Sequence, residues 1–551
     1  MIWHLAAVWE VIAEAIPHRT ALINGETRRS WGEFETRAAS LTAGLIAAGV
    51  GPGNKVAVLG LNSNEYLEAH FALFKARAVP VNVNYRYGEA ELTYLLDNAD
   101  AEAVIFESRF ADRVAAVAPA LPKLRLLVEI ADGAGGGGLQ GASDYEALIA
   151  ANPPASPGAY DENDIYMLFT GGTTGMPKGV MYAHRDLSQA MMLGYDLRGE
   201  PRPQTAADLA ASVRRRADAG EAPVTLAASP LMHGTGLWGG AFVALGLGGA
   251  AVSIRSMSFD ADEVWRVVER ERVSDIAIVG DVFARPILAS LRRAAAAGRP
   301  YEISSLKRVL SSGVMFTSDT KRGLLEFADM VIIDSMGATE GGMATSVVSR
   351  ASPPGPTAIF QKNPTTRVFR DDGQEVVPGS GEIGMLANGG PAPLGYYKDP
   401  AKSAATFRVI DGRRYSFPGD YAQVAADGSI ILLGRGSACI NTGGEKVFPE
   451  EVEEVLKAHP DVEDCLVVGA ADERLGERVT AVLAAAAGRS IDQAALIAFA
   501  RTRLAGYKLP RAIVVAAAIE RAANGKPDYR WARAQIEAAS VEAASSQAAA
   551  S

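Results

Sequence analysis

The sequence predicts an α/β fold with a large N-terminal domain of layered α/β subdomains, followed by a smaller α+β domain. Over roughly the first 430 residues, short β-branched runs alternate with segments whose apolar positions recur at helical spacing, a pattern typical of largely parallel sheets covered by helices. The chain has 551 residues, 48% of them hydrophobic, which is enough material for several cores. The composition shifts near Gly434, and the residues after it predict the smaller unit.

Individual elements follow from the same patterns. Buried strands are expected at 55–59, 103–106, 275–279 and 331–334, and a helix at 31–48. In the smaller domain, Pro449 is expected to open a helix whose first turn carries Glu450 and Glu451, because proline suits the first helical position and acids favour the N-terminal end of the helix dipole. Strands should follow at 465–468 and 479–483. We therefore predict an N-terminal domain over 1–434, a C-terminal domain over 435–536 and a disordered, Ala/Ser-rich tail over 537–551.

Composition excludes several classes of protein. The formal net charge of −10 argues against a protein that coats nucleic acid or an anionic membrane. The two cysteines, Cys439 and Cys465, have no metal-ligand spacing and form no disulfide framework, which favours a cytoplasmic location. The N-terminus lacks the basic region of a secretory signal, and no apolar run reaches the ~20 residues that span a bilayer. The segment 201–223, which mixes prolines, arginines and acids, is expected to be a solvated excursion.

The most informative segment is 167–179, Met-Leu-Phe-Thr-Gly-Gly-Thr-Thr-Gly-Met-Pro-Lys-Gly. A strand-like run leads into glycines whose backbone N–H groups can approach phosphate oxygens, hydroxyls that add donors, and a lysine that offsets charge. It differs from the kinase-type loop, because two residues separate Gly175 from Lys178 and no Ser or Thr follows the lysine. The candidate ATP-binding residues are Thr170, Gly171, Gly172, Thr173, Thr174, Gly175 and Lys178.

This Thr-Gly-Gly-Thr-Thr-Gly-x-Pro-Lys-Gly string resembles the signature of the adenylate-forming (AMP-binding) superfamily, which includes acyl-CoA synthetases, luciferases and the adenylation domains of peptide synthetases. Further segments resemble motifs of that family in the same order, over roughly residues 10–535. They lie at 230–238, 312–314, 334–340, 415–420, 434–441, 442–453 and 524–530. The resemblance implies the adenylate-forming fold, with a C-terminal domain that moves during catalysis.

In the N-terminal part, the resemblance implies an acyl pocket, an adenine site and a metal site. His233, Gly234 and Trp238 would line the acyl pocket, with His233 as a gate beside the reacting carboxylate, although a lone histidine is often structural. Adenosine would lie against Ser312, Gly313, Val314, Ser335, Met336, Gly337 and Ala338. Thr339 would contact phosphate, and Glu340 would hold Mg²⁺ as an oxygen ligand. Met336 replaces the family's usual aromatic residue, which leaves adenine stacking open.

Further along the chain, Asp420 would accept hydrogen bonds from the ribose hydroxyls, and Arg435 would reach the ribose or the α-phosphate. Ser437 occupies the hinge position, where many relatives have Asp or Lys. Gly443, Gly444 and Glu445 would border the coenzyme A tunnel. Lys526 would enter the active site during adenylation.

The predicted activity is that of an acyl-CoA synthetase. ATP and a carboxylic acid give acyl-AMP and pyrophosphate, and the acyl group then passes to coenzyme A, with Mg²⁺ as cofactor. The glycines around His233 favour a medium- or long-chain fatty acid, or the side-chain acid of a ring compound such as a steroid, and a homodimer is one expected assembly. Two alternatives stay open: an acyl-AMP ligase that loads a carrier protein, and a nucleotide-binding regulatory protein that has lost catalysis.

Overall fold

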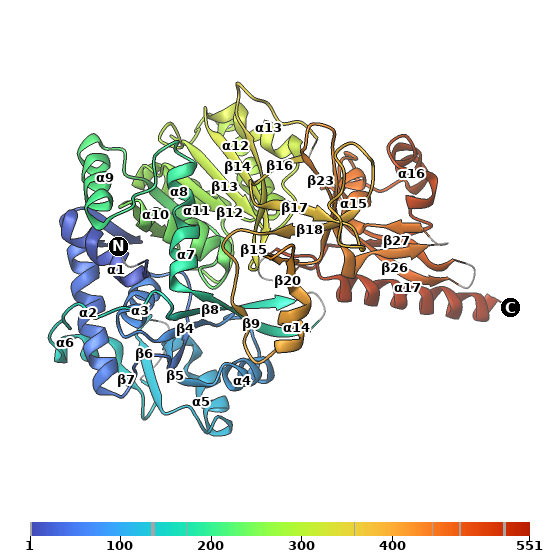
Figure 1. Ribbon diagram of the computed structural model, residues 1–551. Coiled ribbons are helices and arrows are strands. Elements are labelled where there is room, and N and C mark those ends of the chain that lie inside the picture. Colours follow the sequence, from blue (N-terminus) through green and yellow to red (C-terminus); the bar gives the residue numbers. More distant parts are fainter. Residues whose placement is uncertain are drawn as a thin grey trace. The chain divides into compact units, whose positions relative to one another are not determined.

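A computed structural model describes residues 3–133, 138–172, 175–356, 359–442, 445–472, 475–521 and 525–550 (Figure 1). The chain divides into two compact units. The first comprises Met1–Gly355 and Gly389–Ser416, and the second comprises Pro356–Asn388 and Phe417–Ser551. None of the helices in the described part of the chain is long and apolar enough to cross a membrane.

The first unit contains two sheets. One runs in the order β2-β1-β11-β10-β12-β13-β14-β15 and is parallel from β1 to β14, with antiparallel strands at both ends. Its strands are β1 (Thr20–Asn24), β2 (Thr27–Ser30), β10 (Val224–Ala227), β11 (Ala250–Ser253), β12 (Asp275–Ile278), β13 (Arg308–Ser312), β14 (Val331–Ala338) and β15 (Gly341–Val348).

The other sheet runs in the order β19-β9-β8-β4-β3-β5-β6-β7. It is parallel from β8 to β7, and β9 and β19 are added antiparallel at the β8 edge. Its strands are β3 (Lys55–Leu59), β4 (Val79–Asn82), β5 (Ala101–Glu107), β6 (Leu126–Ile130), β7 (Ser143–Asp144), β8 (Ile165–Gly172), β9 (Gly175–Ala183) and β19 (Gly395–Tyr396). The hairpin β20 (Phe407–Ile410) and β21 (Arg413–Ser416) also belongs to this unit.

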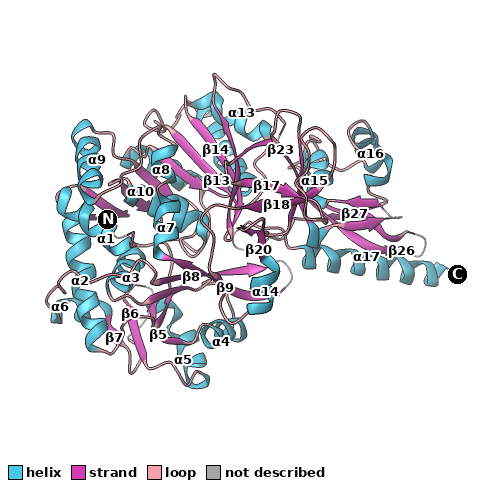
Figure 2. Cartoon of the chain, viewed as in Figure 1, coloured by secondary structure: helices cyan, strands magenta, loops and turns pink. Residues whose placement is uncertain are grey.

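Helices cover the sheets of the first unit in layers (Figure 2). Because side chains alternate along a strand, neighbours in β10 face opposite ways: Ala227 joins the core under α1, α2, α3 and η3, whereas Leu226 joins the core under α11, α12 and α13. The helices are α1 (Leu5–Ala15), α2 (Trp31–Ala47), α3 (Asn64–Lys75), α4 (Glu89–Asn98), α5 (Ala111–Val117), α6 (Tyr145–Ala151), α7 (His184–Met191), α8 (Leu193–Asp196), α9 (Ala206–Ala219), η3 (Thr235–Phe242), α10 (Val243–Gly246), α11 (Ala261–Glu271), α12 (Gly280–Ala296), α13 (Ser318–Phe327) and α14 (Pro400–Thr406).

The second unit contains two further groups of strands. One joins β16 (Ile359–Lys362), β23 (Ile430–Arg435), β22 (Asp420–Val424), β18 (Gly384–Asn388) and β17 (Thr366–Phe369), all antiparallel. The other joins β25 (Glu445–Val447), β24 (Ile440–Thr442), β27 (Gly476–Ala485), β26 (Val462–Asp472) and β28 (Ala512–Ala516). Its helices are α15 (Pro449–Lys457), α16 (Gln493–Arg501) and α17 (Tyr529–Ala550).

Most of the predicted elements are present. The strand over 55–59 and the helix opened by Pro449 begin at the expected residues, and α2 starts at Trp31 because Ser30 and Glu33 form a capping box. Two features differ. The segment 201–223 is not a solvated excursion, since α9 lies within it and buries Leu209 and Val213. The segment predicted as a disordered tail is helical through Ala550, in keeping with the high helix propensity of alanine.

The compact units have other bounds than the predicted domains, which stay a prediction. The sequence places one boundary at residues 434–435, whereas the chain passes between the compact units after Gly355, Asn388 and Ser416. The physical reason is the antiparallel pairing of β22 with β23, which joins residues 420–435 to the strands of the second unit. A composition shift in the sequence cannot reveal such long-range pairing.

Candidate active site

The predicted phosphate loop is the tip of a β-hairpin. Strands β8 and β9 are antiparallel, Thr170 pairs with Lys178, and Gly172 pairs with Gly175. Gly171 lies within β8, whereas Thr173 and Thr174 lie outside the described residues. Because side chains alternate along β9, Lys178, Val180 and Tyr182 share one face of this strand.

A second hairpin carries the predicted metal ligand. Strands β14 and β15 pair as far as Ala338 with Gly341, so Thr339 and Glu340 form its two-residue turn. The predicted strand at 331–334 extends to Ala338, which places the whole adenine segment Ser335, Met336, Gly337 and Ala338 on β14 with half-buried side chains or backbone.

The other predicted adenine segment lies at the end of the neighbouring strand. Ser312 is the last residue of β13 and pairs with Ser335. The next residue, Gly313, has φ = +101°, and a Cβ placed there would lie 3.8 Å from Thr235 Oγ1. Val314 is half-buried. The carboxyl ends of β13 and β14 therefore meet beside the start of η3.

Two tyrosines hold the Thr339–Glu340 turn. The hydroxyl of Tyr182 on β9 donates to the Thr339 carbonyl oxygen at 2.8 Å, and the hydroxyl of Tyr396 on β19 donates to Glu340 Oε1 at 2.6 Å. Glu340 is 8% exposed and Tyr396 5% exposed. Neither tyrosine was predicted from the sequence, because each is remote along the chain from the turn that it contacts.

Cationic side chains gather beside this turn. The Lys178 ammonium lies 4.7 Å from the centre of the Tyr396 ring. Burial and, next, the neighbouring ammonium of Lys402 on α14 lower the pKa of Lys178 to about 8, against an opposing attraction from Glu340. Two nearby ammonium groups are stabilised by a ligand with several negative charges, so the cluster suits a polyphosphate. Lys402 belongs to no recognisable motif, so its position beside Lys178 could not be predicted from the sequence.

The predicted acyl-pocket segment follows β10. His233 is half-buried, and its backbone N–H donates to the Pro230 carbonyl oxygen at 3.1 Å. Gly234 precedes the π-helix η3, and the indole Nε1 of Trp238 donates to the Tyr166 hydroxyl at 3.1 Å. The Trp238 ring also meets the Tyr182 ring edge-on, with centroids 5.7 Å apart. Tyr182 therefore links the acyl segment to the Thr339–Glu340 turn.

In the second unit, two predicted nucleotide-binding residues are neighbours. Asp420 and Arg435 pair across β22 and β23, and Arg435 Nε donates to Asp420 Oδ1 at 3.2 Å. Behind them, the Arg435 backbone N–H lies 3.4 Å from Glu450 Oε1. Burial, followed by repulsion from Glu453, raises the pKa of Glu450 to about 8.

The remaining predicted residues also lie in the second unit. Ser437 falls in the 3₁₀ turn Gly436–Ala438, and Glu445 begins β25, where it pairs with Thr442. Gly443 and Gly444 lie outside the described residues. Lys526 is half-buried and follows Gly525, which has φ = +74°.

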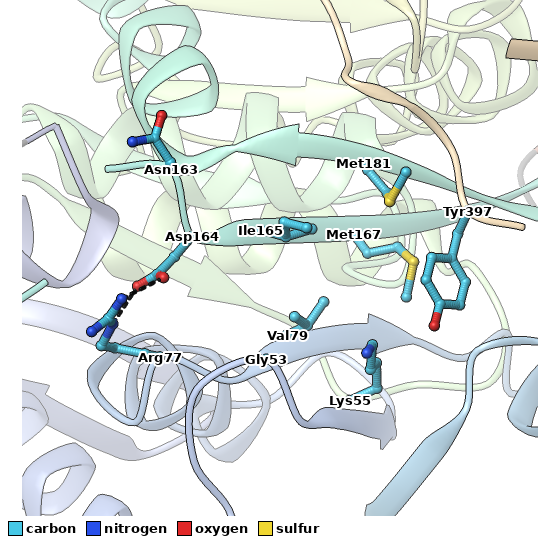
Figure 3. A pocket seen from close by; sticks show the side chains of 10 residues that line it. All are labelled: Gly53, Lys55, Arg77, Val79, Asn163, Asp164, Ile165, Met167, Met181 and Tyr397. Carbon is cyan, nitrogen blue, oxygen red and sulfur yellow. Dashed lines mark hydrogen bonds and ion pairs between the residues drawn. The ribbon is translucent and has the colours of Figure 1, made fainter. Parts of the chain in front are cut away.

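A separate pocket of about 280 Å³ lies on the second sheet of the first unit (Figure 3). Its lining comes from β3, β4, β8, β9 and the residues beside them. It is lined by Gly53, Lys55, Arg77, Val79, Asn163, Asp164, Ile165, Met167, Met181 and Tyr397. None of the predicted site residues lies among them.

The described residues contain no cluster of three or more His, Cys, Asp or Glu side chains that could hold a metal ion. A single carboxylate at Glu340 nevertheless fits Mg²⁺, which proteins often hold through one or two carboxylates together with substrate phosphates.

The chain resembles known proteins over most of its length. Residues 9–397 match the AMP-binding enzyme family, and residues 451–526 match the AMP-binding enzyme C-terminal domain. The chain is 41% identical to the medium/long-chain-fatty-acid–CoA/3-oxocholest-4-en-26-oate–CoA ligase of Mycolicibacterium smegmatis, covering 97% of this chain and 96% of that protein.

Two further comparisons extend the likeness. The 3-oxocholest-4-en-26-oate–CoA ligase of Rhodococcus rhodochrous is also 41% identical, over 97% of this chain and 96% of that protein. The crystal structure of the anthranilate CoA ligase AuaEII in complex with anthranoyl-AMP shares the fold, with a TM-score of 0.83 at 23% identity and 98% coverage of both chains. The chain therefore belongs to the AMP-binding enzyme family, in its branch of AMP-forming acyl-CoA ligases.

Proposed function

We propose that this ligase activates a medium- or long-chain fatty acid, or the side-chain acid of a steroid-like ring compound, and joins it to coenzyme A. Adenylate-forming CoA ligases use ATP and coenzyme A. The observation that carries the substrate class is the 41% identity, over nearly the whole chain, to ligases whose names state both kinds of acid.

The first unit would bind the ATP phosphates. Lys178 and the backbone of the β8–β9 hairpin offset their charge, and Thr339 contributes a hydroxyl beside them. Glu340 would hold Mg²⁺, which supplies charge neutralisation on the phosphates when bound. The buried carboxylate, fixed by a tyrosine hydroxyl and attracting the Lys178 ammonium, supports this assignment.

The adenosine part would lie along the carboxyl ends of β13 and β14. Ser312, Gly313 and Val314 would cover one side of adenine, and the strand from Ser335 to Ala338 the other. A Met336 thioether is polarisable enough to cover a ring in place of an aromatic side chain. Asp420 would accept hydrogen bonds from the ribose hydroxyls, and Arg435 would orient Asp420 and reach the ribose or the α-phosphate.

In the first half-reaction, an oxygen of the substrate carboxylate attacks the α-phosphorus of ATP and pyrophosphate leaves, giving acyl-AMP. Lys526 orients the carboxylate and the α-phosphate, and His233 lies beside the reacting carboxylate. Catalysis then consists of positioning and charge stabilisation, without an enzyme nucleophile.

In the second half-reaction, the coenzyme A thiolate attacks the acyl carbonyl carbon and AMP leaves, giving the thioester. We propose that the C-terminal domain, from residue 435 onward, rotates about Ser437 between the two steps. The rotation withdraws Lys526 and presents Gly443, Gly444 and Glu445 to the pantetheine arm.

The test is pyrophosphate release with ATP and Mg²⁺ across acids from acetate to long-chain and steroid side-chain acids, with and without coenzyme A. The proposal predicts turnover that requires both an apolar acid and coenzyme A. Turnover at the same rate with and without coenzyme A would favour a ligase that loads a carrier protein. No release with any acid would favour a regulatory nucleotide-binding protein.

We also propose that the enzyme acts in the cytoplasm as a homodimer. Light scattering coupled to size-exclusion chromatography measures the assembly directly, and a mass of one chain would contradict the dimer.

A further inference from the structure

We propose that Tyr396 is a positioning residue for adenylation, which holds the Glu340 carboxylate and the Lys178 ammonium as two separate ligands for the ATP phosphates and their metal. This inference rests on the proposed function, in which both groups act on ATP. The Tyr396 side chain would set the distance between the Lys178 ammonium and the Glu340 carboxylate.

The strand register explains how one tyrosine reaches both groups. Strand β19 pairs with β9 so that Tyr396 lies opposite Val180. Lys178 is two residues before Val180 and on the same face of β9, which makes it a diagonal neighbour of Tyr396. Its ammonium lies 4.7 Å from the ring centroid, within the range of a cation–π contact.

The tyrosine hydroxyl points to the other hairpin. It donates to Glu340 Oε1 at 2.6 Å, a charge-assisted hydrogen bond between two side chains that are each less than a tenth exposed. A bond to one carboxylate oxygen fixes the rotation of the carboxylate. Glu340 thus keeps one orientation before any ligand arrives, as preorganised catalysis requires.

Holding the two groups separately matters because they carry opposite charges. If Lys178 and Glu340 formed a direct ion pair, their charges would neutralise each other. The ammonium would then be less available to the ATP phosphates, and the carboxylate less available to the metal. Within the part of the chain that the structure describes, no such ion pair within 4.0 Å is present. Instead, the lysine lies over the ring of Tyr396 and the glutamate accepts from its hydroxyl.

Tyr396 is itself held in place. Its backbone N–H donates to Ser403 Oγ at 2.8 Å, and Ser403 Oγ donates to the Asp399 carbonyl oxygen at 2.6 Å at the start of α14. The next residue, Tyr397, donates its hydroxyl to Asp100 Oδ2 at 2.7 Å and lines the pocket of Figure 3. Tyr397 therefore offers a matched control: the same residue type with a hydroxyl-to-carboxylate bond, one position along the chain and away from Glu340.

The test compares Tyr396→Phe with Tyr397→Phe, since each variant loses one hydroxyl donated to a carboxylate. ATP–pyrophosphate exchange measures adenylation, and coenzyme A thioester formation from supplied acyl-AMP measures the second half-reaction. We expect Tyr396→Phe to lower the exchange rate by about 10- to 100-fold, the value of a hydrogen bond to a charged group. In Tyr396→Phe, thioester formation should stay within about twofold of the wild-type rate. In Tyr397→Phe, both exchange and thioester formation should stay within about twofold of wild type, the range typical of substitutions at residues without a role in the reaction.

Two further comparisons distinguish a positioning role of Tyr396 from a general loss of stability. In the Glu340→Gln background, Tyr396→Phe should have little additional effect on exchange, because the hydroxyl acts through that carboxylate. Tyr396→Leu, which also removes the ring from Lys178, should raise the KM for ATP by a further few-fold relative to Tyr396→Phe. Equal losses in both half-reactions, or equal losses in Tyr396→Phe and Tyr397→Phe, would overturn the inference.

A binding measurement distinguishes this inference from the proposed function. Calorimetry gives the factor by which Mg²⁺ tightens ATP binding, without any acid or turnover. We expect Tyr396→Phe to reduce that factor and Tyr397→Phe to preserve it, even if no acid in the panel is a substrate. An unchanged factor in Tyr396→Phe, in a protein whose wild type releases pyrophosphate, would overturn the inference while the proposed function stands.

Discussion

The lowered pKa of Lys178 predicts that adenylation weakens with rising pH. Below its pKa the side chain is an ammonium that attracts phosphate, and above it the charge is lost. The pKa of about 8 comes first from burial and next from the Lys402 ammonium. The favourable charge is therefore present at pH 7 and disappears as the pH rises through 8.

The magnitude follows from the fraction of protonated lysine. At pH 9, one unit above this pKa, about one tenth of Lys178 in the free enzyme carries its proton. The kcat/KM for ATP reports groups of the free enzyme, so it should fall to about one tenth of its plateau at pH 9. ATP–pyrophosphate exchange is the suitable assay, because it omits the coenzyme A thiol, which titrates in the same range.

Two variants identify the group responsible. Lys178→Arg should have a flat profile from pH 7.5 to 9.5, since a guanidinium stays charged throughout. Lys402→Met should move the alkaline decline to higher pH, because one of the causes that lower the pKa of Lys178 is removed. A wild-type profile that is flat to pH 9.5, or a decline at an unchanged pH in both variants, would show that Lys178 is not the group that titrates.

Three further predictions concern the second unit. Lys526→Ala should reduce ATP–pyrophosphate exchange by about 100-fold or more while sparing thioester formation from supplied acyl-AMP, and equal losses would contradict its assigned role. The pKa of Glu450 is raised from 4.5 to about 8, so its contribution to stability is complete below pH 4.5 and is lost as the pH rises toward 8. The wild type should therefore lose unfolding free energy between pH 5 and pH 7, whereas Glu450→Gln should not. Urea titration should show that the stability of the variant relative to wild type rises by about 2–3 kcal/mol over this range. Gly434→Ala should destabilise the protein by about 1–3 kcal/mol, because its Cβ would lie 2.1 Å from Glu450 Oε2, whereas Gly428→Ala, also at positive φ but in open space, is the control for backbone strain alone.

Local patterns predicted the elements that local physics determines. The strand at 55–59 and the start of α2 follow from hydrophobic periodicity and a capping box, both of which involve neighbouring residues. The candidate phosphate loop between Thr170 and Lys178 was recognisable because its glycines and threonines are contiguous, whereas its place at the tip of a β-hairpin was not predicted.

Contacts between distant segments were out of reach. Tyr396 lies 56 residues from Glu340, and its strand β19 belongs to a different sheet from the β14–β15 hairpin that carries Glu340. Lys402 carries no signature, since its effect on Lys178 depends on where α14 begins. Burial also determines the charge of Glu450, which the sequence could not predict. Glu450 does lie in the first turn of α15, as expected, but its carboxyl is buried against β23. This burial outweighs the helix dipole, which favours the charged form.

We propose that this one enzyme makes acyl-AMP and then converts it to a thioester. The most direct measurement mixes the protein with ATP, Mg²⁺ and radiolabelled fatty acid without coenzyme A, quenches the mixture within seconds and quantifies acyl-AMP before and after coenzyme A is added. Acyl-AMP should accumulate to as much as one equivalent per chain and then disappear, with stoichiometric acyl-CoA and AMP formed in its place. Acyl-CoA formed with ADP and phosphate, without any acyl-AMP, would contradict it.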